Sequence, residues 1–275
     1  GNGFLKADEE STKAFADDRP NIIFFLTDDQ RNDFLGCTGH PIVKTPNIDK
    51  LAGEGRLFDN AFVSTSICAA SRATLLTGLY ERTHRFTFGT PPIANIHTNQ
   101  SYPALLKKEG YLTGFIGKFG IRVRKGARDT MFDSFVPLNR SPYFHKQKDG
   151  SLRHETQVAA DRAIDFLARA KKQSEPFCLS VSFNASHAED GDKKNHFPYP
   201  KVVGSLYEGV KMPVPRLSDP KVFESQPEFL RKSMNRDRYF WRWDTEEKYQ
   251  NNMRNYLRMI SGIDHAIGRV IKELK

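Results

Sequence analysis

The 275-residue chain contains only 3 cysteines, and no two of them form a CxxC pair. This count excludes a disulfide scaffold and gives no zinc-site spacing. No apolar run comes near the roughly 18 residues of a membrane span, and no signal-peptide pattern opens the chain. Glycine-rich and aromatic RNA-binding signatures are also missing, so we expect no nucleic-acid partner. The 38% of hydrophobic residues are enough for a sizeable core, which excludes a largely disordered chain.

The formal charge is +9, and most of the excess lies in the second half of the chain. Residues 1–137 hold 17 basic and 15 acidic residues, whereas residues 138–275 hold 25 and 18. A basic excess attracts polyanions such as nucleic acid, an anionic membrane or an acidic glycan. A solvated basic face explains the same excess equally well.

Segments typical of strands alternate with segments typical of helices. Asn21–Thr27 and Phe177–Phe183 are nearly unbroken apolar runs, as expected of strands buried on both faces. Residues 253–274 repeat apolar positions at helical spacing, with Asp244 as the expected N-cap. The alternation predicts an α/β sheet covered by helices. Further strands are predicted at Leu57–Val63 and Tyr111–Ile116, and further helices at residues 46–55, Ser71–Thr77, Tyr102–Glu109 and Glu155–Lys171.

The length of the chain fits one large or two small domains. We expect a small, polar N-terminal segment over residues 1–18 and one domain over residues 19–275. Within this domain, residues 188–243 are proline-rich and charged, without clear periodicity, which predicts a long insertion loop. The aromatic and basic residues Arg238–Asp244 would line an anionic-sugar site or pack the loop onto the domain.

Two adjacent carboxylates, Asp28 and Asp29, follow the first apolar run directly. Ligands of open α/β sheets bind at the carboxyl ends of the strands. Neighbouring carboxylates repel each other unless a cation lies between them, and calcium or magnesium prefers such oxygen ligands. The pair therefore predicts a divalent-cation site, with a helix cap or a solvated turn as the alternative.

Cys68 lies just ahead of a predicted helix, and Arg72 follows four residues later. A helix N-terminus presents unpaired N–H groups, which suit an anion and lower the pKa of a thiol. The planar guanidinium of Arg72 suits the oxygens of a sulfate or phosphate group. The motif predicts an anion site with a nucleophile, although Cys68 also fits the role of a small buried hydrophobe.

Three motifs carry a resemblance to a known family: RPNIIFFLTDDQ, KTPNIDKLAGEG and FDNAFVSTSICAASRATLLTGLY. They resemble the N-terminal half of a type I, formylglycine-dependent sulfatase of the alkaline-phosphatase-like superfamily. The resemblance implies a mixed, mostly parallel sheet sandwiched between helices. It also implies hydrolysis of sulfate esters, on a sulfated carbohydrate or an aryl sulfate, by a bacterial periplasmic or secreted enzyme.

The resemblance assigns roles to individual residues. Asp28, Asp29 and Cys68 would be metal ligands, with Ca²⁺ as the expected ion and Mg²⁺ as the alternative. Cys68 would be converted to the formylglycine nucleophile by a sulfatase-maturing enzyme. Arg72 would hold the resulting diol and balance charge, and Lys118, in GKFG, would bind the sulfate group.

Two histidines complete the predicted site. His187, in SFNASHAED, matches a histidine after a strand, which would assist departure of the leaving group. His84, in ERTHRF, follows the signature and is a substrate-binding candidate, with a surface turn as the alternative. Cys37 and Cys178 are predicted to be core thiols.

The sequence departs from the family pattern at three places. Ala70 replaces the proline of the C-x-P-S-R signature, and Gly120 stands where the family has a histidine. A strand ending in Asp-Asn, which would supply two further metal ligands, is expected beyond Lys275, so the fold is expected to be truncated before its last core strands. The alternatives are a phosphonate or phosphodiester hydrolase of the same superfamily, or a non-catalytic anion-binding fragment completed by a C-terminal remainder.

Overall fold

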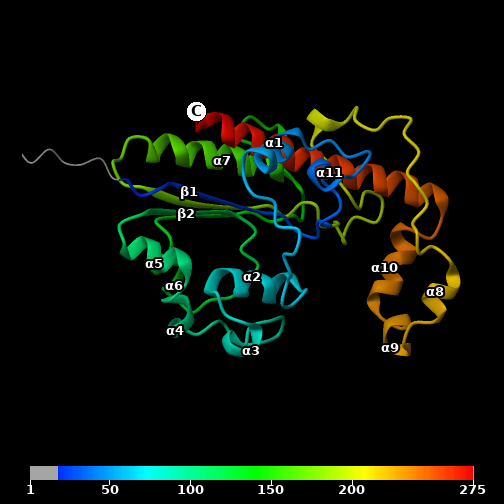
Figure 1. Ribbon diagram of the computed structural model, residues 1–275, viewed down its shortest axis with the longest axis horizontal. Coiled ribbons are helices and arrows are strands. Elements are labelled where there is room, and N and C mark those ends of the chain that lie inside the picture. The colour runs from blue at the N-terminus through cyan, green and yellow to red at the C-terminus, as the bar shows by residue number, and fades with distance from the viewer. Residues whose placement is uncertain (1–17, 275) are drawn as a thin grey trace, which may run out of the picture.

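A four-stranded parallel sheet forms the centre of the fold (Figure 1). The structure is a computed structural model that describes residues 18–274. All three pairs of neighbouring strands are parallel. The predicted, mostly parallel sheet is therefore confirmed, and a small antiparallel pair stands apart from it. The sheet order is β1 (Ile22–Leu26), β6 (Phe177–Ser182), β2 (Leu112–Gly117) and β3 (Ser134–Pro137), and the separate pair is β4 (Phe144–Lys146) and β5 (Leu152–His154).

Helices cover both faces of the sheet (Figure 1). Among residues 18–274, no helix is both long enough and apolar enough to cross a membrane. One face carries α1 (Pro46–Glu54), α7 (Glu155–Ala170) and α11 (Glu246–Glu273), and the other carries α2 (Cys68–Thr77), α3 (Glu81–His84), α4 (Asn95–Thr98), α5 (Tyr102–Lys108) and α6 (Ala127–Met131).

The main core lies between the sheet and the two long helices α7 and α11. Ala159 and Ala163 of α7 and Ile260 and Ile263 of α11 are fully buried in this core, where the two helices pack against each other. Full burial of one such isoleucine stabilises the fold by about 1.5–3 kcal/mol. Asp264 of α11 joins α1 to this layer, because its carboxylate accepts hydrogen bonds from the first backbone N–H groups of that helix.

Two strand predictions need correction. Residues 57–63 contain no strand, and Phe58 and Phe62 are 79% and 91% exposed. An apolar run forms a strand only where a neighbouring strand pairs with it. No strand of the described sheet pairs with residues 57–63. The first predicted strand is confirmed as β1, but its residues are half-buried rather than buried on both faces, because β1 is at the edge of the described sheet.

The segment predicted as a long insertion loop contains short helices. They are η2 (Lys201–Val203), α8 (Pro220–Glu224), α9 (Glu228–Arg231) and α10 (Met234–Arg242). The cap of α11 also lies one residue beyond the prediction. Thr245 accepts the backbone N–H of Lys248, while the Asp244 carboxylate pairs with the Lys248 ammonium at 2.7 Å.

Candidate active site

Three parallel strands end at one edge of the sheet and bring the predicted residues together there. Asp28 follows β1, Lys118 follows β2, and His187 lies in the turn after β6. The Asp28 N–H donates to the Ala185 carbonyl at 3.0 Å, and the Lys118 N–H donates to the Ser182 carbonyl at 2.7 Å. These backbone bonds fix the strand ends relative to one another, so the side chains that follow share one site.

Two glycines allow the close approach of these segments. Gly117 has a φ of +101°, and a Cβ atom there would lie 1.9 Å from the Ser182 carbonyl oxygen. Gly120 has a φ of +68°, and a Cβ atom there would lie 2.8 Å from Cδ of Arg72. A side chain at position 120 is therefore incompatible with this position of Arg72, and glycine is the residue that the site accommodates.

A cluster of charges surrounds the buried carboxylate of Asp28, which is 3% exposed. The Lys118 ammonium donates to Asp28 Oδ2, and Nη2 of Arg72 lies 3.5 Å from the same oxygen. Nη1 of Arg72 donates to the Lys118 carbonyl at 2.8 Å and also to the Ser182 hydroxyl. Burial lowers the pKa of Arg72 and the Asp28 charge opposes this, but a guanidinium stays charged at neutral pH. Two cations thus face one buried carboxylate, and the second carboxylate of the site, Asp29, is exposed beside them.

Cys68 opens the ten-residue helix α2 and lines a cavity together with Asp28 and Arg72 of this cluster, whereas Lys118 is not among the lining residues. The cavity has a volume of about 280 Å³, and Asp28, Asp29 and Arg72 also line it. The helix N-terminus adds partial positive charge beside the cysteine. Ala70 is fully buried in the first turn of α2. A backbone N–H in the first turn has no acceptor within the helix, so this position suits proline, which lacks the N–H, and alanine alike.

His187 and Asp29 form the outer part of the site. Nε2 of His187 lies 3.4 Å from Asp29 Oδ2, and Nδ1 lies 2.7 Å from the Ala188 carbonyl, to which it donates in the matching tautomer. The Asp29 carbonyl accepts the Tyr256 hydroxyl at 2.9 Å, while its carboxylate is 60% exposed. The imidazole therefore presents Nε2 toward the exposed carboxylate.

A buried support beneath His187 was not predicted from the sequence. Glu155, the first residue of α7, is 0% exposed, and its Oε1 accepts both the backbone and the side-chain N–H of Asn184 at 3.1 Å. The Tyr143 hydroxyl lies 3.0 Å from the Asn184 carbonyl and 2.6 Å from the His187 carbonyl, and donates to them. Burial raises the pKa of Glu155 to about 7 and raises that of Tyr143 as well. No motif marks Glu155, because its partner lies 29 residues away.

His84 lies apart from the cluster, on α3 beneath α2. It is 4% exposed, Nε2 lies 3.1 Å from the Thr74 hydroxyl, and Nδ1 accepts the Phe86 N–H at 3.0 Å. Burial is the main cause of a lowered pKa, which favours the neutral ring. His84 is not among the residues that line the cavity of Cys68, so the structure does not bring it together with the cluster.

Comparison with known proteins identifies the family. The family model described as Sulfatase matches residues 20–275. The chain belongs to the sulfatase family. An N-acetylglucosamine-6-O-sulfatase from Bacteroides thetaiotaomicron is 26% identical to this sulfatase-family chain over 311 residues, which cover 94% of the chain and 55% of that protein. The chain thus spans about half the length of this curated relative.

Solved structures share the fold of this chain. A protein in complex with its substrate D-glucosamine-2-N,6-O-disulfate has a TM-score of 0.70 and 22% identity to this sulfatase-family chain, and the match covers 93% of this chain and 62% of that chain. A phosphonate monoester hydrolase from Agrobacterium radiobacter also has a TM-score of 0.70 and 22% identity, with 93% and 59% coverage.

Sulfatases are generally metal-dependent, and the described residues supply only part of a metal site. Calcium takes about six to eight oxygen ligands. Asp28 and Asp29 offer carboxylates, but Asp28 is already neutralised by Lys118 and Arg72. Within residues 18–274, no group of three or more His, Cys, Asp or Glu side chains is placed to hold a metal ion. The described side chains of this sulfatase-family chain therefore do not complete the expected site.

Proposed function

We propose that the protein containing this chain hydrolyses sulfate esters, on a sulfated carbohydrate, with a nucleophile derived from Cys68. The observation that carries the proposal is the placement of Cys68, at the N-terminus of α2, in the cavity that Asp28 and Arg72 also line. The sulfated-sugar names of the similar proteins support the substrate class. An aryl sulfate is the simplest model substrate, and a periplasmic or secreted location remains a prediction.

The side chains of the cluster have distinct proposed roles. Conversion of Cys68 to formylglycine by a maturing enzyme would supply a hydrated aldehyde as the nucleophile. Arg72 and Lys118 would bind the sulfuryl oxygens, where negative charge concentrates, because fixed cations in a buried site stabilise such charge strongly. His187 would donate a proton to the leaving oxygen, a contribution of typically about 10²- to 10⁴-fold in rate. The metal would be Ca²⁺, or Mg²⁺ as the alternative, with Asp28 and Asp29 among its ligands.

The test combines mass spectrometry with hydrolysis by the natural-length protein, produced together with a maturing enzyme. We expect the Cys68 peptide to carry the aldehyde or its hydrate, and we expect Cys68→Ala to abolish release of sulfate. Cys37→Ala is the matched control, because Cys37 lies outside this cavity and should leave activity intact. An active enzyme with an unmodified Cys68 thiol would overturn the proposed nucleophile.

A phosphonate or phosphodiester hydrolase is the second candidate, because a phosphonate monoester hydrolase shares the fold. The charge cluster would bind a phosphonate as well as a sulfate, since both present anionic oxygens to Arg72 and Lys118. Rates on an aryl sulfate and an aryl phosphonate separate the two candidates. Binding of sulfate without turnover of either substrate would favour a non-catalytic anion-binding protein.

A further inference from the structure

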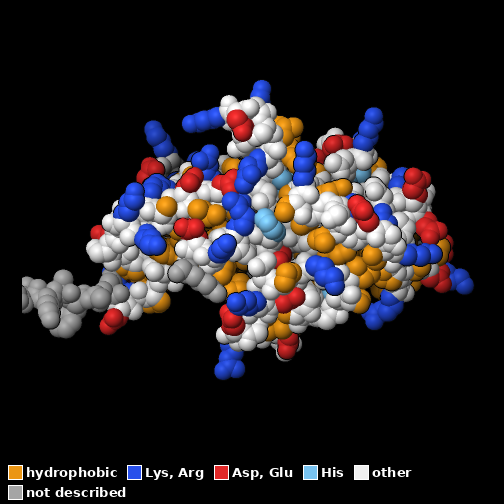
Figure 2. Space-filling view, turned by 90° about the horizontal axis from the view of Figure 1, so that it is seen from above, with side chains coloured by type: hydrophobic (Ala, Val, Ile, Leu, Met, Phe, Trp, Pro, Cys, Tyr) orange, Lys and Arg blue, Asp and Glu red, His pale blue; other side chains and the backbone are white. Residues whose placement is uncertain are grey.

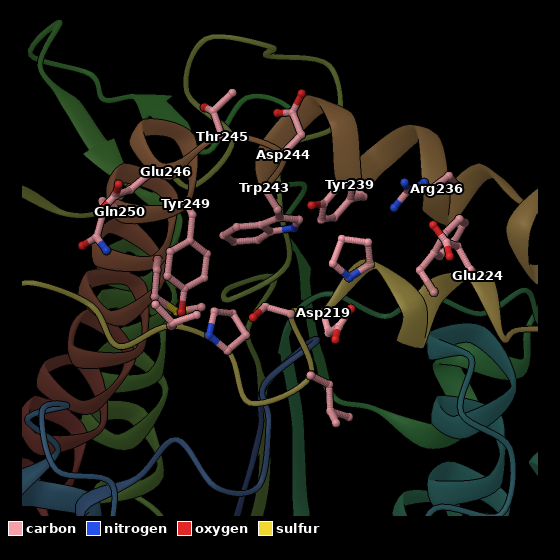
Figure 3. A pocket seen from close by; sticks show the side chains of 17 residues that line it. Asp219, Glu224, Arg236, Tyr239, Trp243, Asp244, Thr245, Glu246, Tyr249 and Gln250 are labelled. Atoms are coloured by element: carbon pink, nitrogen blue, oxygen red, sulfur yellow. The ribbon is translucent and has the colours of Figure 1, made fainter.

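A second cavity, larger than that of Cys68, lies on the segment that joins α8, α10 and the start of α11. Its volume is about 650 Å³, within the range of about 300–1,000 Å³ of small-molecule sites. In Figure 3, Trp243 lies between Tyr249 and Tyr239, and Asp219 faces these rings across the cavity. The rings of Trp243 and Tyr249 pack edge to face, with their centroids 6.2 Å apart.

The charges that line this cavity are mainly negative. Four carboxylates line it, against the single cation Arg236. The Arg236 guanidinium is held by aromatic rings, with its carbon 3.6 Å from the Phe223 centroid and 4.6 Å from the Tyr239 centroid. Lys248 pairs with Asp244 and Lys211 with Glu246, but the remaining excess is negative and disfavours a sulfate group, although the chain as a whole is basic. The carboxylates belong to Asp219, Glu224, Asp244 and Glu246.

Aromatic contacts connect this cavity to the candidate active site. The Trp243 ring lies 5.4 Å from Phe197, and Phe197 lies 5.6 Å from Tyr256, measured between ring centroids. The Tyr256 hydroxyl in turn donates to the carbonyl of Asp29, in the loop after β1. In Figure 1, the α8–α10 segment lies beyond the end of the sheet at which β1 leads into this loop. Both sites therefore lie toward the same end of the sheet, and buried rings connect them through the interior.

We propose that this aromatic and acidic cavity binds an unsulfated pyranose unit, preferentially one with an ammonium group, of the same glycan whose sulfated unit occupies the candidate active site. That one glycan occupies both sites rests on the proposed function. That the second cavity prefers a sugar with an ammonium group rests on the residues that line it. Aromatic rings pack against the apolar face of a sugar and attract a cation. Carboxylates accept hydrogen bonds from hydroxyl and ammonium groups.

The test measures binding through tryptophan fluorescence in a protein that carries Cys68→Ala and Trp241→Phe. The first change removes the proposed nucleophile, and the second leaves Trp243 as the only one of the chain's 2 tryptophans. D-Glucosamine, D-glucose and D-glucose 6-sulfate are the probes, with arginine methyl ester to represent a basic peptide. We expect saturable binding of glucosamine, weaker binding of glucose, and no binding of glucose 6-sulfate at the same concentrations.

A matched pair of variants assigns the binding to this cavity. Glu224→Gln should weaken the binding of glucosamine roughly two- to fivefold, as for loss of one exposed charge interaction. Glu228→Gln, an exposed residue of the neighbouring α9 outside the cavity, should leave binding unchanged. Equal or tighter binding of glucose 6-sulfate, no binding of any sugar, or binding of the arginine ester alone would overturn the proposal. The readout does not depend on hydrolysis, so a failed sulfatase assay and a failed binding experiment are distinguishable.

Discussion

Glu155 provides a quantitative test of the support beneath His187. Its carboxyl group is 0% exposed, and burial raises its pKa from 4.5 to about 7. Between these two pH values the unfolded chain releases the proton while the folded chain keeps it, so stability falls as pH rises. Below pH 4.5 ionisation of Glu155 does not change the stability, and above pH 7 the loss of stability that it causes stays constant. The difference corresponds to a loss of about 3 kcal/mol in the free energy of unfolding.

Glu155→Gln isolates this contribution, because glutamine keeps an oxygen that accepts the Asn184 N–H groups but cannot ionise. We expect the free energy of unfolding of the variant, relative to the unchanged protein, to rise by about 3 kcal/mol between pH 4.5 and pH 7.5. Urea unfolding followed by circular dichroism across this range measures the difference. The contributions of the other carboxylates to the free energy of unfolding are the same in both proteins and cancel. Glu228→Gln, at an exposed position, should show no such rise. A difference that stays constant with pH would refute the reasoning.

Two further substitutions test the geometry of the site. Gly120→Ala places a Cβ atom 2.8 Å from Arg72 Cδ, and we expect a loss of roughly 1–3 kcal/mol in urea unfolding together with weaker sulfate binding. Gly126→Ala has a similar φ of +83° but no atom within 4 Å of the new Cβ, so an equal effect on sulfate binding would contradict the contact with Arg72. Tyr143→Phe removes the hydroxyl that donates to the His187 carbonyl, and thermal unfolding should show a loss of about 1–3 kcal/mol. An unchanged melting temperature would exclude this role.

The sequence predicts those parts of the fold that depend on short-range patterns. The apolar runs at β1 and β6 stand out because buried parallel strands carry few polar residues. Asp28 could be placed because it follows a strand and ligands bind where parallel strands end, whereas Lys118 was placed by the family resemblance of GKFG. Residues 57–63 show the limit, since an apolar segment without a partner strand stays exposed.

Long-range contacts account for what the sequence does not predict. Glu155 looks like an ordinary first-turn carboxylate of a helix, and only the fold places it against Asn184. His84 follows the signature as a substrate-binding residue would, but the Thr74 hydroxyl and the Phe86 N–H hold it beneath α2. Only the fold shows that Arg72 occupies the space that a side chain at position 120 would need.

Net charge is a poor guide to where an anion binds on this chain. Lys and Arg side chains are scattered among Asp and Glu on the face that Figure 2 shows. Three arginines of the basic second half, Arg140, Arg238 and Arg242, converge on the carboxylate of Asp190, and Arg140 also lies 3.7 Å from Glu189, so their charges are partly compensated. Near Asp28, by contrast, two cations share one buried carboxylate. Because buried charges are screened far less than exposed ones, we expect this cluster, rather than the net charge, to determine where a sulfate group binds.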